Sequence, residues 1–332
     1  MNRLLRRLVF AMLLGVVVYG AFALYRGFSE IGASLLSFWW PAFFLGCALA
    51  MGNYLTRFLK WEYYLAKLDV RGVPKTDSLL TFLSGFVLTI TPGKVGEVAK
   101  SLVLRQTHGV AMARTATIVL AERLTDVLGV VILIVLGSAG FSGGLVWAAV
   151  GSVLVFIILA VIASDTVFSS ILSQLERASH AVAKHVPKVR EAWESLRVIT
   201  TPRALVLPTL LSVVAWTLEG LSLWVILRGF GQITAIPVAC FFYAVATLAG
   251  ALVPVPGGLG VTEGMLEEQL FRVGGVDKVI STSAMILTRF ATLWFAVLVG
   301  FIALSLLRMR FPGLMSDGEP KDPPPAADQA GD

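Results

Sequence analysis

Charge, cysteine and histidine are all scarce in this sequence. Only 14% of its 332 residues are charged and 57% are hydrophobic, whereas an average soluble domain carries about 25% charged residues. This composition excludes an ordinary soluble globular protein and predicts a polytopic membrane protein. The two cysteines, Cys47 and Cys240, lie inside apolar runs, which argues against a disulfide framework or a zinc site. The three histidines have no metal-ligand spacing, so we expect no metal and no other cofactor.

Sequence signatures of catalysis are also missing. The chain contains no P-loop and no Asp-x-Asp motif, and no predicted soluble segment is large enough for a donor site. We therefore expect a protein that is not an enzyme, and an intramembrane enzyme is the least favoured reading. The net charge of +6 does not indicate a nucleic-acid partner, because the basic residues lie between apolar runs. They are better explained as topology signals and as contacts to anionic lipid headgroups.

The apolar runs predict an all-α fold in a single membrane domain over residues 1–312. Full spans are expected near 8–24, 38–56, 115–136, 145–163, 205–227 and 279–307. The first is longer than a usual signal-peptide core, which favours an uncleaved span over cleavage near Ala21-Phe22-Ala23. Residues 169–203, broken at Pro187, predict an amphipathic cytoplasmic segment. The Pro- and Asp-rich residues 313–332 predict a disordered cytoplasmic tail.

Two further apolar segments are each interrupted by proline and glycine. The interruptions read Thr91-Pro92-Gly93-Lys94-Val95-Gly96-Glu97 and Pro254-Val255-Pro256-Gly257-Gly258-Leu259-Gly260. Proline and glycine break helices, and broken backbone at membrane depth must be buried in protein or line a cavity. We therefore expect two re-entrant hairpins of half-helices. With both termini cytoplasmic, most basic residues fall on the cytoplasmic side and the hairpins enter from opposite faces. The halves, about 38–164 and 205–307, then form an inverted repeat.

Each interruption is followed by an arginine inside a later apolar run, Arg123 and Arg289. A charge at this depth is costly unless it is paired or hydrated, so it indicates function by default. Arg123 lies between Glu122 and Asp126, and an internal ion pair with either acid is the structural alternative. Arg289 has no acid beside it. Its expected partner is Glu97, Glu219, Glu263 or a bound anion, and phosphate matches the guanidinium fork.

The interruptions are expected to complete an anion site. Half-helices beginning near Gly96-Glu97 and Thr262-Glu263 direct free N–H groups and positive dipole ends into the cavity. Lys94 adds a charge, and the glycines permit close approach of a headgroup. The candidate binding residues are Lys94, Arg123, Arg289, Gly93, Gly96, Gly257, Gly258 and Gly260, with Pro92, Pro254 and Pro256 as the helix breaks.

The acidic residues at membrane depth leave more than one reading open. Glu97 and Glu263 either cap their own helices or carry a coupling proton, and we weigh these two roles evenly. Glu219 is a proton relay, an arginine partner or a residue near a helix end. Glu122 and Asp126 are candidates for ion pairing or coupling. Arg57 and Trp61, in an aromatic and basic stretch, are expected to anchor the membrane interface.

Taken together, Pro92 to Glu97, Arg105, Glu122 to Asp126, Pro256 to Gly260 and Arg289 resemble a flippase-like membrane family. That family is typified by the transmembrane region of lysylphosphatidylglycerol synthases, and the resemblance covers residues 8–307. It implies a multi-pass protein of the bacterial inner membrane that moves a lipid between leaflets. The aminoacyltransferase domain of the synthases has no counterpart here, so their synthase activity is not implied.

The function expected from these residues and this resemblance is lipid translocation. The substrate would be an anionic phospholipid, an isoprenoid or a glycolipid, held by its headgroup between the two interruptions. The alternative is a non-transporting accessory subunit that serves a lipid-modifying, hopanoid or glycosyltransferase enzyme. Such a subunit predicts that Arg123→Ala and Arg289→Ala are tolerated whenever the protein folds.

Overall fold

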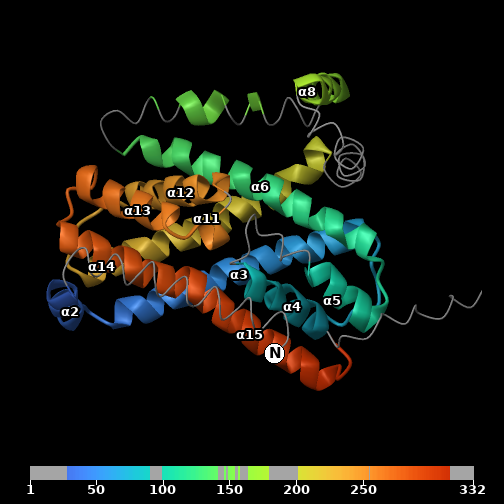
Figure 1. Cartoon of the computed structure of the whole chain (residues 1–332), viewed down its shortest axis with the longest axis horizontal. Coiled ribbons are helices and arrows are strands. Elements are labelled where there is room, and N and C mark those ends of the chain that lie inside the picture. Colours follow the sequence, from blue (N-terminus) through green and yellow to red (C-terminus); the bar gives the residue numbers. More distant parts are fainter. Residues whose placement is uncertain are drawn as a thin grey trace, which may run out of the picture.

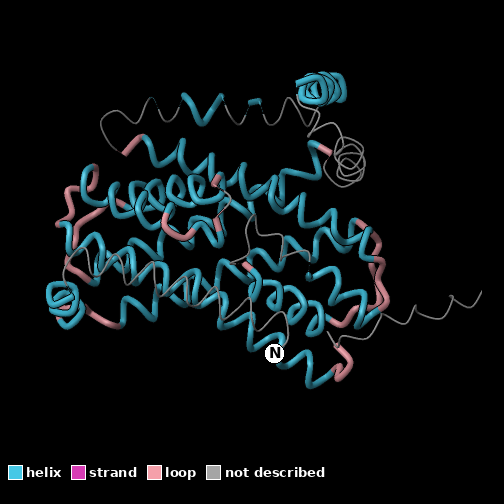
Figure 2. Tube along the Cα trace, viewed as in Figure 1, coloured by secondary structure: helices cyan, strands magenta, loops and turns pink. Residues whose placement is uncertain are grey.

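The computed structural model describes residues 28–89, 99–140, 146, 149–153, 156–157, 164–178, 201–253 and 255–314. Within these ranges all regular structure is helical, as predicted (Figure 2). The predicted span at 8–24 and the first interruption lie outside the described residues, as do most of the span at 145–163, residues 179–200 and nearly all of the tail.

Two series of helices follow the same order. The first has α3 (Pro41–Lys67), then α4 (Lys75–Ser84) with its 3-10 extension η1 (Gly85–Leu88), then α5 (Ala99–His108) and α6 (Met112–Ser138). The second has α11 (Pro202–Gly229), α12 (Ile236–Leu252), the 3-10 turn η3 (Pro256–Gly258) and α13 (Val261–Arg272). It ends in α14 (Lys278–Arg289), the π-helix η4 (Phe290–Trp294) and α15 (Phe295–Arg310). Two other helices, α2 (Phe28–Leu36) and α8 (Asp165–Ala178), lie outside both series.

Local sequence explains where several of these helices begin. Proline occupies the first turn of α3, α11 and α12, where its missing N–H is not needed. The hydroxyl of Thr201 accepts a hydrogen bond from the amide of Ala204 at the start of α11, and Asp277 accepts one from the amide of Val279 at the start of α14. Among the described residues, three helical segments are long and apolar enough to cross a membrane: 41–67, 203–229 and 278–310.

The structure corrects several predicted boundaries. The second span does not end near Thr56, because α3 continues to Lys67. The predicted span at 279–307 is one helical rod, but the π-helix η4 interrupts it directly after Arg289. The end of the predicted surface segment belongs to α11, which begins at Pro202. The predicted half-helices correspond to α4 with η1, α5, α12 and α13.

The long helices α3 and α11 pack against each other at the centre of the molecule. Helix α6 packs on α11 and α12, and α15 packs on α4 and η1, so the two series interlock. The short helices α4 and α5 lie toward one end of the molecule and α12 and α13 toward the other (Figure 1). Glycine allows the close contacts, since a Cβ at Gly129 of α6 would lie 2.8 Å from the Ser212 side chain of α11.

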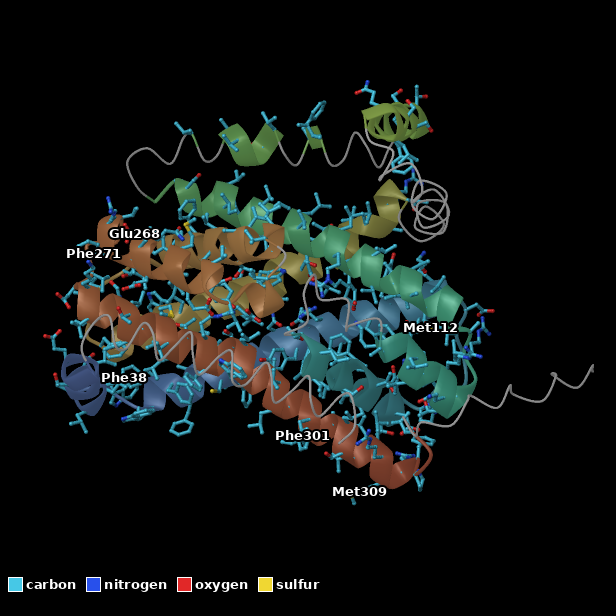
Figure 3. All side chains as sticks on the ribbon, in the orientation of Figure 1. Phe38, Met112, Glu268, Phe271, Phe301 and Met309 are labelled. Atoms are coloured by element: carbon cyan, nitrogen blue, oxygen red, sulfur yellow. The ribbon has the colours of Figure 1, made fainter. Side chains whose placement is uncertain are left out.

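The outer surface of the bundle is apolar, as membrane exposure requires. Phe301 and Met309 of α15 point away from the neighbouring helices (Figure 3) and are 50% and 78% exposed. Inside, one cluster of buried apolar residues joins α11 to α14, and a second, rich in aromatic rings, joins α3, α4 and α5. Several charged side chains are buried as well, among them Lys60, Lys100 and Glu263.

Candidate functional site

A cavity with about 640 Å³ of empty space, counting its open mouth, lies between the two series and is lined by both polar and apolar side chains. The ends of both interrupted segments border it. Phe86 and Thr89 come from the chain just before the first interruption, and Gly257 and Gly258 come from the second. The remaining lining comes from the central helices and includes Tyr54, Arg57, Trp216, Glu219, Tyr243, Thr247, Gly250, Ala251, Thr262, Arg289, Thr292, Leu293 and Ala296. The second interruption and the described chain just before the first interruption therefore border the same cavity.

Arg289 enters this cavity from the end of α14 and is held by the second interruption. Its Nε lies 2.6 Å from Oε1 of Glu263, and its terminal nitrogen donates to the carbonyl of Gly257 at 3.0 Å. The other oxygen of Glu263 accepts a hydrogen bond of 2.7 Å from the amide of Gly260. Glu263 therefore caps α13 and pairs with Arg289 at the same time. This ion pair is one of the alternatives that the sequence predicted for Arg289. The carbonyl of Gly257 is turned toward Arg289 by backbone with φ of +62°, a value that favours glycine.

Arg57 is also part of the cavity lining, which corrects its predicted place at the membrane interface. Its guanidinium carbon lies 5.5 Å from the centre of the Phe86 ring and its terminal nitrogen 3.7 Å from Asp126. Trp61, the other predicted anchor, is fully buried and donates its indole N–H to the hydroxyl of Ser78. Both residues face inward because α3 runs past the predicted boundary, and each finds a polar or aromatic partner there.

Lys60 lies beneath Arg57 and is completely buried. Its Nζ lies 2.6 Å from Oδ1 of Asp126 and 2.8 Å from the hydroxyl of Ser212, which itself lies 3.1 Å from the same carboxylate oxygen. The hydroxyl of Thr125, at 3.2 Å, completes the surroundings of this ammonium group. The cluster fastens α3, α6 and α11 together, because each of the three helices contributes polar atoms to it.

A second buried lysine holds α5 against α6. Lys100 lies 2.6 Å from Oε2 of Glu122, and its ammonium group is 4.8 Å from the ring centre of Trp61 and 5.0 Å from that of Phe82. A Cβ at Gly85 would lie 2.6 Å from the Lys100 stem, so the glycine makes room for it. In the second series the corresponding two helices are joined by Glu263 of α13 and Arg289 of α14. The ion pair thus recurs with its polarity reversed.

Glu219 of α11 accepts a short hydrogen bond from the hydroxyl of Tyr243 on α12. Glu219 is 7% exposed and lines the cavity. Also in the lining, the hydroxyl of Tyr54 donates at 2.7 Å to the carbonyl of Thr292, within the π-helix. π-Helical turns are rare and often occur at functional sites. The turn here follows Arg289 directly and brings the Thr292 carbonyl within reach of α3.

Several predicted residues are not brought together by the described structure. Arg123 is half-buried on α6 but does not line the cavity. The residues Pro92, Gly93, Lys94, Gly96, Glu97 and Pro254 lie outside the described residues. Glu122 and Asp126 have Lys100 and Lys60 as ion-pair partners, neither of which the sequence argument proposed.

One signal for the missed residues was present in the sequence. Arg57 and Lys60 are three residues apart and share one face of a helix. In the part of the chain that the structure describes, no group of three His, Cys, Asp or Glu side chains is arranged to hold a metal ion.

Residues 8–300 match the family described as the lysylphosphatidylglycerol synthase TM region. The chain belongs to this family. Among similar proteins is a UPF0104 membrane protein of Methanothermobacter thermautotrophicus, 22% identical over 326 residues, an alignment that covers 87% of this chain and 90% of that protein. Another is a UPF0104 membrane protein of Pyrococcus horikoshii, 26% identical over 274 residues, which covers 74% and 80%.

Family membership and the apolar helices together establish a multi-pass membrane protein. The two relatives are membrane proteins of about this chain's length, since the alignments cover most of both partners. The family is that of a transmembrane region. The cavity lies within the matched region, because every residue that lines it falls between 54 and 296.

Proposed function

We propose that this protein is a lipid translocase that moves an anionic phospholipid, isoprenoid or glycolipid between the leaflets of the bacterial inner membrane. The observation that carries the proposal is one cavity that contains Arg57 and Arg289 and is bordered by the chain just before the first interruption and by the second interruption. Paired broken helices around a midplane cavity are the usual architecture of transporters with inverted repeats. Two guanidinium groups at that depth suit a phosphate headgroup.

The two arginines have different parts in this proposal. Arg289 is fixed in direction by Glu263 and the Gly257 carbonyl, so it presents a constant positive edge to the cavity. Arg57 lies 3.7 Å from Asp126, longer than a hydrogen bond, and that carboxylate already has Lys60 at 2.6 Å. Arg57 can therefore turn toward a phosphate without leaving Asp126 unpaired.

The surrounding helices provide the path. We propose six full spans and two re-entrant hairpins, with both termini cytoplasmic and the hairpins entering from opposite faces. The headgroup crosses through the cavity that contains Arg57 and Arg289, while the acyl or prenyl chains remain in the bilayer beside the apolar outer surface. The interlocked halves then expose the cavity to each leaflet in turn. Lys94 and the N-terminus of α5, at the first interruption, would complete the site, and Arg123 would support it from α6.

The test is lipid movement by the purified protein in liposomes. Fluorescent phosphatidylglycerol in the outer leaflet is reduced by dithionite, and the protected fraction reports transfer between leaflets. Arg57→Gln is expected to slow transfer about tenfold to a hundredfold, because it removes a charge-assisted hydrogen-bond donor of about 1.5–3 kcal/mol. Arg228→Gln is the control, since Arg228 is exposed at the end of α11 and stacks on Trp224. Wild-type protein that moves no fluorescent phospholipid or isoprenoid lipid would refute the proposal.

A further inference from the structure

We infer that Glu219 binds a proton from the cavity and that this proton crosses the membrane together with the anionic headgroup. The inference rests on the proposed lipid translocation and names its coupling ion. A carboxylate repels phosphate, so the headgroup site itself does not need Glu219. Proton binding gives this residue a role. A negative charge placed in a cavity for an anion requires a compensating partner whenever the anion enters.

Access distinguishes Glu219 from the other buried acids. Of the described residues that line the cavity, it is the one that carries a carboxylate. Glu122 and Asp126 lie behind the lining in the lysine clusters, and Glu263 is occupied by Arg289 and by the Gly260 amide. Only a carboxylate on the cavity surface can exchange a proton with water that enters from either side.

The neighbours of Glu219 suit such an exchange. Tyr243 on α12 donates its hydroxyl to the carboxylate, which fixes one oxygen and leaves the group oriented in either protonation state. From α3 the titratable or charged groups facing the cavity are Tyr54 and Arg57, and from α14 it is Arg289. Helix α6, also packed on α11, carries Glu122, Arg123 and Asp126, which are not part of the lining.

These positions predict cooperative binding of the two ligands. Hydronium in the cavity gives one proton to the Glu219 carboxylate, and the neutral acid no longer opposes a phosphate held by Arg57 and Arg289. On the opposite side the phosphate leaves, the arginines again stabilise the carboxylate, and the proton returns to water. Proton and headgroup therefore move in the same direction, with a coupling in the usual range of about 5-fold to 150-fold in affinity. A proton gradient directed along the transfer would accelerate it.

The experiment uses full-length protein in liposomes that contain fluorescent phosphatidylglycerol and a trapped pH-sensitive dye. For the wild type we expect transfer to be at least fivefold faster when the gradient runs along it than when the gradient is reversed, with matching proton movement reported by the dye. Glu219→Gln is expected to abolish the effect of the gradient on the rate of transfer and to move no protons. Tyr243→Phe retains the carboxylate and should only shift the pH at which half the maximal rate is reached.

Glu267→Gln provides the matched control. Glu267 is a buried glutamate that accepts a hydrogen bond from Thr282 and does not line the cavity, so its gradient response should equal that of the wild type. Wild-type transfer that ignores the gradient overturns the inference while lipid translocation stands, whereas no transfer at any pH removes translocation itself. If Glu219→Gln instead slows only lipids with an amine in the headgroup and keeps the response to the gradient, Glu219 is a headgroup ligand and the inference is wrong.

Discussion

Replacement of Lys60 by methionine tests whether the buried cluster beneath the cavity holds the three central helices together. Methionine keeps the length and apolar stem of the side chain and removes only the ammonium group. Asp126, which is 4% exposed, would then keep Ser212 at 3.1 Å and Arg57 at 3.7 Å but lose its closest cation. The substitution thus leaves the buried carboxylate of Asp126 without the positive charge that lies closest to it.

The expected loss is large. Removing one member of a buried ion pair costs about 3–5 kcal/mol, because the remaining charge cannot be hydrated. Replacing both members costs much less, so Lys60→Met combined with Asp126→Asn should recover most of the loss. Lys75 provides the comparison, because it pairs with Glu62 while its side chain is 80% exposed. Lys75→Met should change the free energy of unfolding by about 0–1 kcal/mol.

The free energy of unfolding can be measured by denaturant titration in mixed micelles or by steric trapping. All four proteins should be compared under one lipid and detergent composition. The reasoning fails if Lys60→Met costs no more than Lys75→Met, since the cluster then contributes nothing beyond an exposed pair. It also fails if the double variant is less stable than Lys60→Met alone, because the loss would then come from packing and not from the unpaired carboxylate.

Three other substitutions test smaller features. Gly250→Ala places a Cβ 2.0 Å from the Thr262 hydroxyl and should lower the free energy of unfolding by about 1–3 kcal/mol in the same assay. At Gly264 a Cβ meets nothing within 4 Å, so Gly264→Ala should stabilise α13 by up to about 1 kcal/mol. Equal effects of the two substitutions would contradict the close packing of α12 on α13. Tyr54→Phe removes the hydrogen bond to the Thr292 carbonyl, which contributes about 0.5–1.5 kcal/mol. We expect faster amide hydrogen exchange in residues 290–294. Unchanged exchange would show that this hydrogen bond does not stabilise the π-helix.

The sequence predicted the helices well because apolar runs of membrane length leave few alternatives. Helices α6 and α11 begin and end close to the predicted residues. The π-helix could not be predicted, since residues 290–294 continue the apolar pattern and only the contact from Tyr54 marks the turn.

The candidate site was predicted less completely, for a physical reason. Arg57 and Lys60 follow aromatic residues at the end of an apolar run, a pattern that is typical of a membrane interface. Their inward position depends on Asp126, which is 66 residues from Lys60 in the chain and lies opposite it only after α3, α6 and α11 have packed. Long-range pairing of this kind leaves no local signal. The pairing of Arg289 with Glu263 was among the predicted alternatives because Arg289 has no acid beside it in the sequence and needs a partner from elsewhere.

The reversed ion pairs explain how two halves with the same helix order come to have different tasks. In each half a charged residue near the start of the short helix after the interruption pairs with one on the following long helix, as Lys100 with Glu122 and Glu263 with Arg289. A buried pair fastens two helices equally well whichever helix carries the cation, so either polarity preserves the architecture. Polarity does decide which charge reaches the cavity. In the first half the cation is enclosed between Trp61 and Phe82, and in the second it lines the cavity. The cation of the ion pair is therefore out of reach of a ligand in the first half and accessible to an anion in the second.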